Sequence, residues 1–481
     1  MKKRRMAITA VMAAGIAAAL WGCHPGREVQ KKPVIVTVWN YYNGAQKELF
    51  DGLVDQFNDS LGREQNIFVE TTSKGTIDEL AQNVTDSVDG KPGADSLPDI
   101  CSLYADTAFE LNGKGLLADM KPYLTQAEMD AYVEGYIEEG RFEAADTLKI
   151  FPTAKSTEDL TLNMTAWEPF AADTGASLED LSTWEGIAKT AESYYRWTDE
   201  QTEAPGDGKA FFGRDAFANY ILVGSMQLGH EIYRIENGEP VLDFDKETMR
   251  KLWDNFYVPY VHGYFLVEGA FCSDDLKTGS LVSYVGSTSG APYTPSAVTY
   301  EDGTSYDITC KVLPLPNFAG TRPCAVQQGA GMVVFHSDEK TERAAVTFLK
   351  WFTGEEENLQ FGAGAGYLPV KKGANNEEFL EKMIAEKNLE ISGALKETLI
   401  VGIKEVQEYK MYTTKPFENS SKARKILNST MIDLAKSSRK MVESLMAEGI
   451  EESEAIGRFT TEEYFEKWYA DTYQKLISIN Q

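Results

Sequence analysis

The alternation of strand-like and helix-like segments limits the fold of this chain more than any other sequence feature. The run VIVTVWN at 34–40 is apolar and β-branched, which is typical of a strand buried on both faces. Apolar residues recur at helical spacing in the next segment, 44–61. The alternation then continues with strand-like segments at 66–73 and 97–105 and helix-like segments at 76–88 and 106–120. This order predicts βαβ units and parallel sheets, and therefore an α/β fold.

Length and charge narrow the class of protein further. A chain of 481 residues is long enough for two or more domains or lobes. The formal net charge of −27 argues against nucleic acid as a partner, because affinity for nucleic acids depends on neutralising phosphates. We interpret this acidity as a feature of solubility. From about residue 376 onward, the sequence predicts a mostly helical, charged region.

No motif for catalysis or for a cofactor is present in the sequence. The four histidines lack the spacing of metal ligands, and no glycine-rich phosphate loop follows a strand. We therefore expect no enzyme activity, no cofactor and no metal. A pair of glycosidase carboxylates stays open as an alternative, because such a pair is defined by the distance between its carboxyl groups and not by sequence spacing.

The first 33 residues predict export and attachment to a membrane. A basic segment, Lys2–Arg5, precedes an apolar segment, Met6–Leu20, that is short for a membrane span; together they predict a signal peptide at 1–22. The sequence ending at Cys23, LWGC, resembles the lipobox of bacterial lipoproteins. That resemblance implies a lipidated Cys23, anchorage to the outer face of the bacterial cytoplasmic membrane and a tether at 23–33. The alternative is a free cysteine beside an uncleaved anchor.

Four further cysteines follow, at Cys101, Cys272, Cys310 and Cys324. None forms a C-x-x-C pair, which makes a zinc site or a thioredoxin-like site a weak interpretation. An exported protein could bridge Cys310 and Cys324, and the sequence leaves that question open.

Four stretches, taken together, resemble family 1 extracellular solute-binding proteins, the sugar-receptor subunits of bacterial ABC importers. They are VIVTVWNYYNGAQKELFDGLVDQFN, LPDICSLYADTAFELNGKGLLADMKPYL, IFPTAKSTEDLTLNMTAWE and VTFLKWFTGEEENLQFGAGAGYLPV. Each motif is weak alone, but all four occur in the family's order between about residues 34 and 371. Leu162 stands where the third motif usually has an aromatic residue.

The resemblance implies a two-lobed fold like that of periplasmic binding proteins, with hinge crossovers between two open sheets and a helical C-terminal region. We expect 34–153 and 287–335 to form the first lobe, and 154–286 and 336–481 to form the second. The ligand would lie between the lobes, which would close around it by a hinge motion.

Loops after strands and at crossovers are the candidate ligand contacts, because ligands of open α/β sheets bind beyond the carboxyl ends of strands. Tyrosine rings can pack on the apolar faces of sugars, and amides, hydroxyls and carboxylates can pair with sugar hydroxyls. The candidates are Tyr41, Tyr42, Asn43, Tyr104, Asp106, Ser156, Thr157, Glu158, Ser287, Thr288, Ser289, Gly331 and, carried over from the family, Tyr367. The alternatives are structural: a tyrosine in the core, Asp106 as a helix cap, and polar residues of turns and hinges.

One further candidate, Arg424, points to a different ligand. Glycerol-3-phosphate receptors within the family resembled use an arginine in a comparable C-terminal segment, and a guanidinium suits phosphate geometry. We therefore keep three functions open. The first is a monomeric, lipid-anchored receptor that delivers a sugar or oligosaccharide to an ABC permease. The second is a receptor for glycerol-3-phosphate or a glycerophosphodiester, and the third is a surface glycoside hydrolase.

Overall fold

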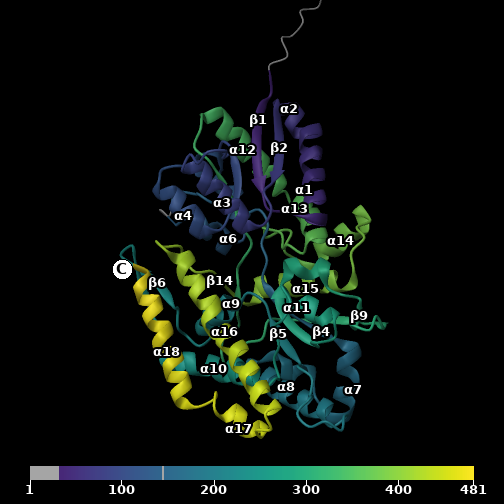
Figure 1. The fold of residues 1–481 in the computed structure, drawn as a ribbon. Helices are drawn as coiled ribbons and strands as arrows, with labels where there is room; N and C mark the ends of the chain where they lie inside the picture. Colours follow the sequence, from purple (N-terminus) through teal and green to yellow (C-terminus); the bar gives the residue numbers. More distant parts are fainter. Residues whose placement is uncertain (1–31, 143–145, 481) are drawn as a thin grey trace, which may run out of the picture.

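The chain folds into two lobes, each built on its own sheet (Figure 1). The computed structural model describes residues 32–142 and 146–480. The predicted lipidation site at Cys23, the signal peptide and most of the tether lie outside the described residues. Within the described part of the chain, no helix is long and apolar enough to cross a membrane. The predicted α/β fold with two open sheets is confirmed.

The first lobe contains a four-stranded sheet in the order β13-β3-β1-β2. Its strands are β1 (Val34–Asn40), β2 (Ile67–Ser73), β3 (Ile100–Leu103) and β13 (Gly331–Val334). β1 runs parallel to β2 and β3, as the βα alternation predicts, and Val36 and Val38 on β1 are fully buried. β13 comes from much later in the chain and pairs antiparallel with β3.

Hydrophobic clusters cover both faces of this sheet. The helices of the lobe are α1 (Gly44–Phe57), α2 (Arg63–Gln65), α3 (Ile77–Val88), α4 (Ala105–Gly113), α5 (Gln126–Asp130), α6 (Glu134–Glu139), α12 (Glu339–Phe352) and α13 (Glu355–Ala365). On one face, the ring of Phe348 on α12 lies 5.2 Å from that of Phe57 on α1. Burial of one such ring contributes about 1.5–3 kcal/mol.

The second lobe contains a four-stranded sheet in the order β11-β4-β8-β5. Its strands are β4 (Glu158–Asn163), β5 (Phe212–Arg214), β8 (Ser283–Ser287) and β11 (Cys310–Leu313). β4 is antiparallel to both β8 and β11, and β5 is parallel to β8. Three two-stranded pairs accompany it: β6 (Tyr233–Glu236) with β7 (Glu239–Leu242), β9 (Ala297–Thr299) with β10 (Ser305–Asp307), and β12 (Cys324–Val326) with β14 (Lys410–Tyr412).

Helices make up most of the remaining second lobe. They are α7 (Met164–Thr174), α8 (Trp184–Asp199), α9 (Phe217–Gln227), α10 (Lys246–Val261), α11 (Cys272–Lys277), α14 (Glu377–Lys387), α15 (Gly393–Glu408), α16 (Ser420–Ala447), α17 (Glu452–Gly457) and α18 (Glu462–Ile477). The long α16 packs against α9, α10 and α18 (Figure 1). The predicted helical C-terminal region is therefore present.

The sheets divide the chain differently from the expected lobe boundaries. β11 lies within 287–335, which we expected in the first lobe, but it pairs with β4 of the second lobe. α12 and α13 lie within 336–481, which we expected in the second lobe, but they pack in the core of the first. The reason is hydrophobic: the aromatic residues of α12 and α13 complete the core that α1 and β1 begin.

The chain passes between the lobes three times; two of these crossovers, at 152–157 and 327–330, lie side by side, and the third follows α13. Ser156 and Gln328 exchange backbone hydrogen bonds of 2.9 and 3.0 Å, which pair the two crossovers directly. Lys155 also pairs with Leu368, which follows α13. The connection between the lobes is therefore a short, hydrogen-bonded set of extended segments.

The four described cysteines are free thiols. Cys310 begins β11 in the sheet of β4, whereas Cys324 begins β12, which pairs with β14. The bridge that the sequence left open is thus not formed, because the two residues belong to different strand pairs.

Candidate ligand site between the lobes

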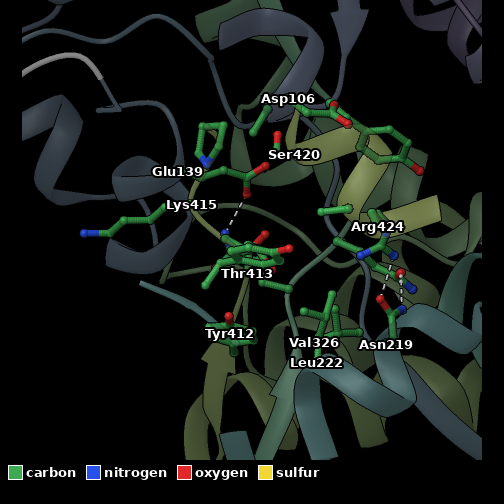
Figure 2. A pocket seen from close by; sticks show the side chains of 18 of the residues that line it. Asp106, Glu139, Asn219, Leu222, Val326, Tyr412, Thr413, Lys415, Ser420 and Arg424 are labelled. Atoms are coloured by element: carbon green, nitrogen blue, oxygen red, sulfur yellow. Dashed lines mark hydrogen bonds between the residues drawn. The ribbon is translucent and has the colours of Figure 1, made fainter. Parts of the chain in front are cut away.

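A cavity opens between the two lobes, beside the crossovers (Figure 2). The first lobe contributes Tyr104, Ala105, Asp106 and Glu139, and the second crossover contributes Gln327, Gln328 and Gly329. The second lobe contributes most of the wall: Asn219, Leu222, Val223, Tyr233, Val326, Tyr412, Thr413, Thr414, Lys415, Pro416, Phe417, Ser420, Ala423, Arg424 and Leu427. A ligand here would touch both lobes.

The first-lobe side of the cavity follows from the direction of the parallel strands. β3 ends at Leu103, and Tyr104 and Asp106 come next, at the start of α4. The carboxyl ends of β1, β2 and β3 lie at the same edge of the sheet, so their loops face the second lobe. Asp106 accepts a hydrogen bond from the backbone N–H of Thr107, as a residue at a helix start does.

Aromatic rings form the apolar part of the second-lobe wall. The rings of Tyr233 on β6 and Phe417 lie 4.7 Å apart, and Tyr412 ends β14 nearby in the same cluster. Burial raises the pKa of Tyr233, so its hydroxyl stays protonated. The hydroxyls of Tyr233 and Ser420 are buried and have no hydrogen-bond partner within the described part of the chain. Such groups are available to a polar ligand.

Arg424 and Lys415 are the exposed basic residues of this wall. Arg424 Nη2 donates a 2.6 Å hydrogen bond to Oδ1 of the buried Asn219 (Figure 2). Among the described residues, no carboxylate forms an ion pair with Arg424. Desolvation raises the pKa of Tyr104 on the first lobe, and the positive charge of Arg424 acts against that rise. Both residues line the cavity, Tyr104 from the first lobe and Arg424 from the second.

Glu139 links the cavity wall to the crossovers. Its Oε2 accepts hydrogen bonds from Lys155 Nζ at 2.5 Å and from Gln327 Nε2 at 2.6 Å. Lys155 also donates to the backbone oxygen of Gly329 at 2.9 Å. The Lys155–Glu139 pair is buried, so loss of either partner would leave an uncompensated charge.

The structure brings Tyr104, Asp106 and Arg424 into the wall of one cavity, as the sequence analysis proposed for a ligand site. Their contact with a ligand stays a prediction.

Other candidates lie elsewhere. Tyr42 is fully buried between Phe50 and Phe361 and packs in the core of the first lobe. Gly331 lies within β13, where a Cβ would meet the side chain of Ile150 at 2.2 Å, so close packing explains the glycine. Asn43 donates to two backbone oxygens and forms a turn.

The polar candidates at the first crossover are also buried. Ser156 is 3% exposed and Thr157 is fully buried, and neither is among the residues that line the cavity. Glu158 forms a buried ion pair with Arg214, whose Nη2 lies 2.7 Å from Glu158 Oε2. These residues are structural parts of the hinge region.

Direct contact between the lobes accounts for the remaining candidates. Ser287 caps the short 3-10 helix η4 (Thr288–Tyr293), with Thr288 buried and the Ser289 hydroxyl 2.9 Å from that of Ser287. Gly366, at a φ of +73°, lies so near this turn that a Cβ would be 2.3 Å from the Thr288 oxygen. The hydroxyls of Tyr41 and Tyr367 lie 3.1 Å apart beside it. In this conformation, these loops are in direct contact.

Several cavity residues escaped the sequence analysis, among them Asn219, Tyr233 and Phe417. The segment YTTKPFENSSKAR, at 412–424, combines aromatic, hydroxyl and basic residues and could have pointed to Phe417, whereas Asn219 and Tyr233 lie outside it. It lies beyond the four motifs that carried the resemblance.

The family comparison agrees with this architecture. The sequence model for bacterial extracellular solute-binding proteins matches residues 52–388, and the chain belongs to that family. The expected resemblance is confirmed. A search among curated proteins found no match.

Solved structures with the same fold cover nearly the whole chain. The cyclic α-maltosyl-1,6-maltose binding protein of Arthrobacter globiformis is 15% identical, covers 93% of this chain and 99% of its own, and has a TM-score of 0.67. UgpB of Mycobacterium tuberculosis, in complex with glycerophosphocholine, is 18% identical; the match covers 92% of this chain and 99% of UgpB, with a TM-score of 0.65. The Thermus thermophilus maltotriose binding protein is 15% identical; the match covers 93% of this chain and 100% of that protein, with a TM-score of 0.60.

Proposed function

We propose that this protein captures a sugar or an oligosaccharide in the cavity between its lobes and delivers it unaltered to an ABC permease. The observation that carries the proposal is the composition of the cavity wall. Aromatic rings of the second lobe lie beside buried hydroxyls without partners, and polar residues of the first lobe face them. Sugars combine apolar CH faces with hydroxyls, and that wall offers a match for each.

Capture would work by a hinge motion about the paired crossovers. A ligand that contacts both lobes binds the closed state more tightly than the open one, and it shifts the population toward closure. The permease would then recognise the closed form. No bond in the ligand needs to break, and the membership in a family of binding proteins supports a receptor over a hydrolase.

The neighbouring structures support a carbohydrate ligand by analogy of fold. Those described as binding a cyclic maltosyl-maltose or maltotriose share the two-lobed fold. We extend this proposal to the cellular setting: a monomeric receptor, held outside the cytoplasmic membrane by a lipid on Cys23, with no nucleic acid partner.

A second ligand class is favoured by one observation. Arg424 faces the cavity without a carboxylate partner among the described residues, which leaves its charge for an anionic ligand group. A phosphate accepts paired hydrogen bonds from a guanidinium. The glycerophosphocholine complex of UgpB shows that this fold holds such a compound. Glycerol-3-phosphate and glycerophosphodiesters are therefore the alternative ligands.

The test is titration calorimetry of residues 24–481 with maltotriose, cyclic maltosyl-maltose, glycerol-3-phosphate and glycerophosphocholine. We expect heat of binding from a saccharide and recovery of the ligand unchanged. Absence of binding by every saccharide, or a hydrolysed product, would contradict the proposal.

Tyr233→Phe sharpens this test, because the buried hydroxyl has no partner in the described protein. Removing it should leave thermal stability unchanged and weaken binding of the preferred ligand about five- to tenfold, the effect of one lost hydrogen bond. Tyr473→Phe, at a partly exposed site on α18, is the matched control. Equal affinities of the two variants would argue against a ligand contact at Tyr233.

A further inference from the structure

A series of hydrogen-bonded side chains behind the cavity wall ends at Arg424. Arg214 Nη2 donates to Glu158 Oε2 at 2.7 Å. Asn219 Nδ2 donates to the other oxygen of Glu158, Oε1, at 2.6 Å. Arg424 Nη2 then donates to Asn219 Oδ1, also at 2.6 Å. The first three residues are buried and Arg424 is exposed, so the buried ion pair reaches the cavity through a single amide.

The charged neighbours determine which way the Asn219 amide faces. An ionised carboxylate can only accept hydrogen bonds, and a guanidinium can only donate them. Glu158 therefore requires the Nδ2 side of the amide, and Arg424 requires the Oδ1 side. Asparagine meets both demands because its short side chain ends in one donor group and one acceptor. A leucine of similar size would leave both neighbours without this partner.

The same amide touches the crossovers. Asn219 Nδ2 lies 3.2 Å from Gln328 Oε1, and Gln328 Nε2 donates to the backbone oxygen of Thr157 at 3.2 Å. Gln328 belongs to the second crossover and Thr157 to the first, and Glu158 begins β4 directly after it. A change in the angle between the lobes would therefore act on the amide that holds Arg424.

We propose that Asn219 is a positioning residue, which holds the Arg424 guanidinium toward the cavity and ties its orientation to both crossovers. The inference rests on the proposed function in treating the cavity as the ligand site. Asn219 on α9 lines the cavity, but its amide nitrogen bonds to Glu158 and its amide oxygen to Arg424, so its effect on a ligand is exerted through Arg424.

A ligand-free experiment tests the positioning role. The full-length protein and Asn219→Leu are treated with phenylglyoxal, which modifies accessible guanidinium groups, and the modified peptides are quantified by mass spectrometry. Arg343 on α12, with a 61% exposed side chain and no place in the cavity, is the internal reference. We expect the ratio of the modification rate of Arg424 to that of Arg343 to be severalfold higher in Asn219→Leu than in the unaltered protein. An unchanged ratio would overturn the proposal. Asn219→Ser replaces the leucine variant if that variant does not fold.

A binding cycle gives the second readout. Affinities for glycerol-3-phosphate and maltotriose are measured for Asn219→Leu, Arg424→Gln and the double variant. The affinity for whichever probe binds should fall about tenfold in each single variant, which is the size of a lost charge-assisted hydrogen bond. The affinity should fall little further in the double variant. Fully additive losses would contradict positioning through Arg424. If neither probe binds the unaltered protein, the cycle uses the ligand that binds in the calorimetry; if no saccharide binds there, the proposed function fails, while the phenylglyoxal ratio still decides the role of Asn219.

Discussion

Individual residues of the same type have different roles in this molecule. Tyr104 and Tyr42 both follow a buried strand, yet Tyr104 lines the cavity and Tyr42 is packed among core rings. The sequence predicts that a polar or aromatic residue follows a strand, but not which side of the sheet it faces. The ion pair of Glu158 could not be predicted from sequence either. Its partner, Arg214, is distant in sequence and comes close only when the strands of the second lobe pair.

Two buried carboxyl groups beside the hinge, Asp159 and Glu405, have a raised pKa, and burial is the main cause for both. Burial raises the pKa of Asp159 to about 7, the Thr398 hydroxyl opposes the rise, and the charge of Glu158 adds to it. The folded state therefore keeps a proton that the unfolded chain releases above its ordinary pKa of about 4. The contribution of the Asp159 carboxyl to the free energy of unfolding should fall as pH rises from about 4 to 7 and level off above that range.

Asp159→Asn tests this pH dependence. The amide keeps the shape and removes the charge, so the variant should be more stable at pH 8, by up to about 4 kcal/mol. Denaturant unfolding at pH 4.5 and pH 8 measures the effect, with Asp471→Asn at an exposed site on α18 as control. An unaltered pH dependence in Asp159→Asn would contradict the assignment to this carboxyl.

At the scale of elements, hydrophobic patterns predicted the strands well. The strand expected at 34–40 is β1 with those bounds. Caps are less predictable, because neighbouring hydroxyls compete for the same helix start. Ser182 and Thr183 both precede α8, and Thr183 is the residue that caps it, by accepting a hydrogen bond from the Gly186 N–H at 3.1 Å. Glu185, in the first turn of α8, pairs with Lys251 on α10.

This cap predicts a difference between two adjacent substitutions. Thr183→Ala should destabilise the second lobe by about 1 kcal/mol, the usual effect of losing an N-cap. Ser182→Ala, the matched control, loses only a hydrogen bond from its hydroxyl to the Glu179 oxygen and should cost less. Thermal unfolding followed by circular dichroism compares them. A larger effect at Ser182 would show that the cap is misassigned.

At the scale of the whole molecule, the two-lobed fold was predictable and the division of the chain between lobes was not. The βα alternation and the four motifs indicate two open sheets. The assignment of β11 and of α12 depends on pairing and packing between segments far apart in the chain, which periodicity does not encode. The cavity has the same origin, since Tyr104, Tyr233 and Arg424 meet only after the lobes form.

The proposed lipid anchor gives the prediction for the intact molecule. Cys23→Ser removes the thiol that would receive the lipid, and the protein should then leave the membrane fraction on cell fractionation. Cys310→Ser, at a free thiol within the second lobe, is the control and should stay with the membrane. Full retention of Cys23→Ser would contradict the lipoprotein interpretation.

The direction of β1 has a mechanical consequence. This strand enters the first lobe at the end remote from the second lobe and runs toward the cavity (Figure 1). A membrane anchor upstream of Val34 would therefore be connected directly to the first lobe only. The second lobe would then move relative to the first by rotation about the crossovers, while the first lobe stays attached to the membrane surface.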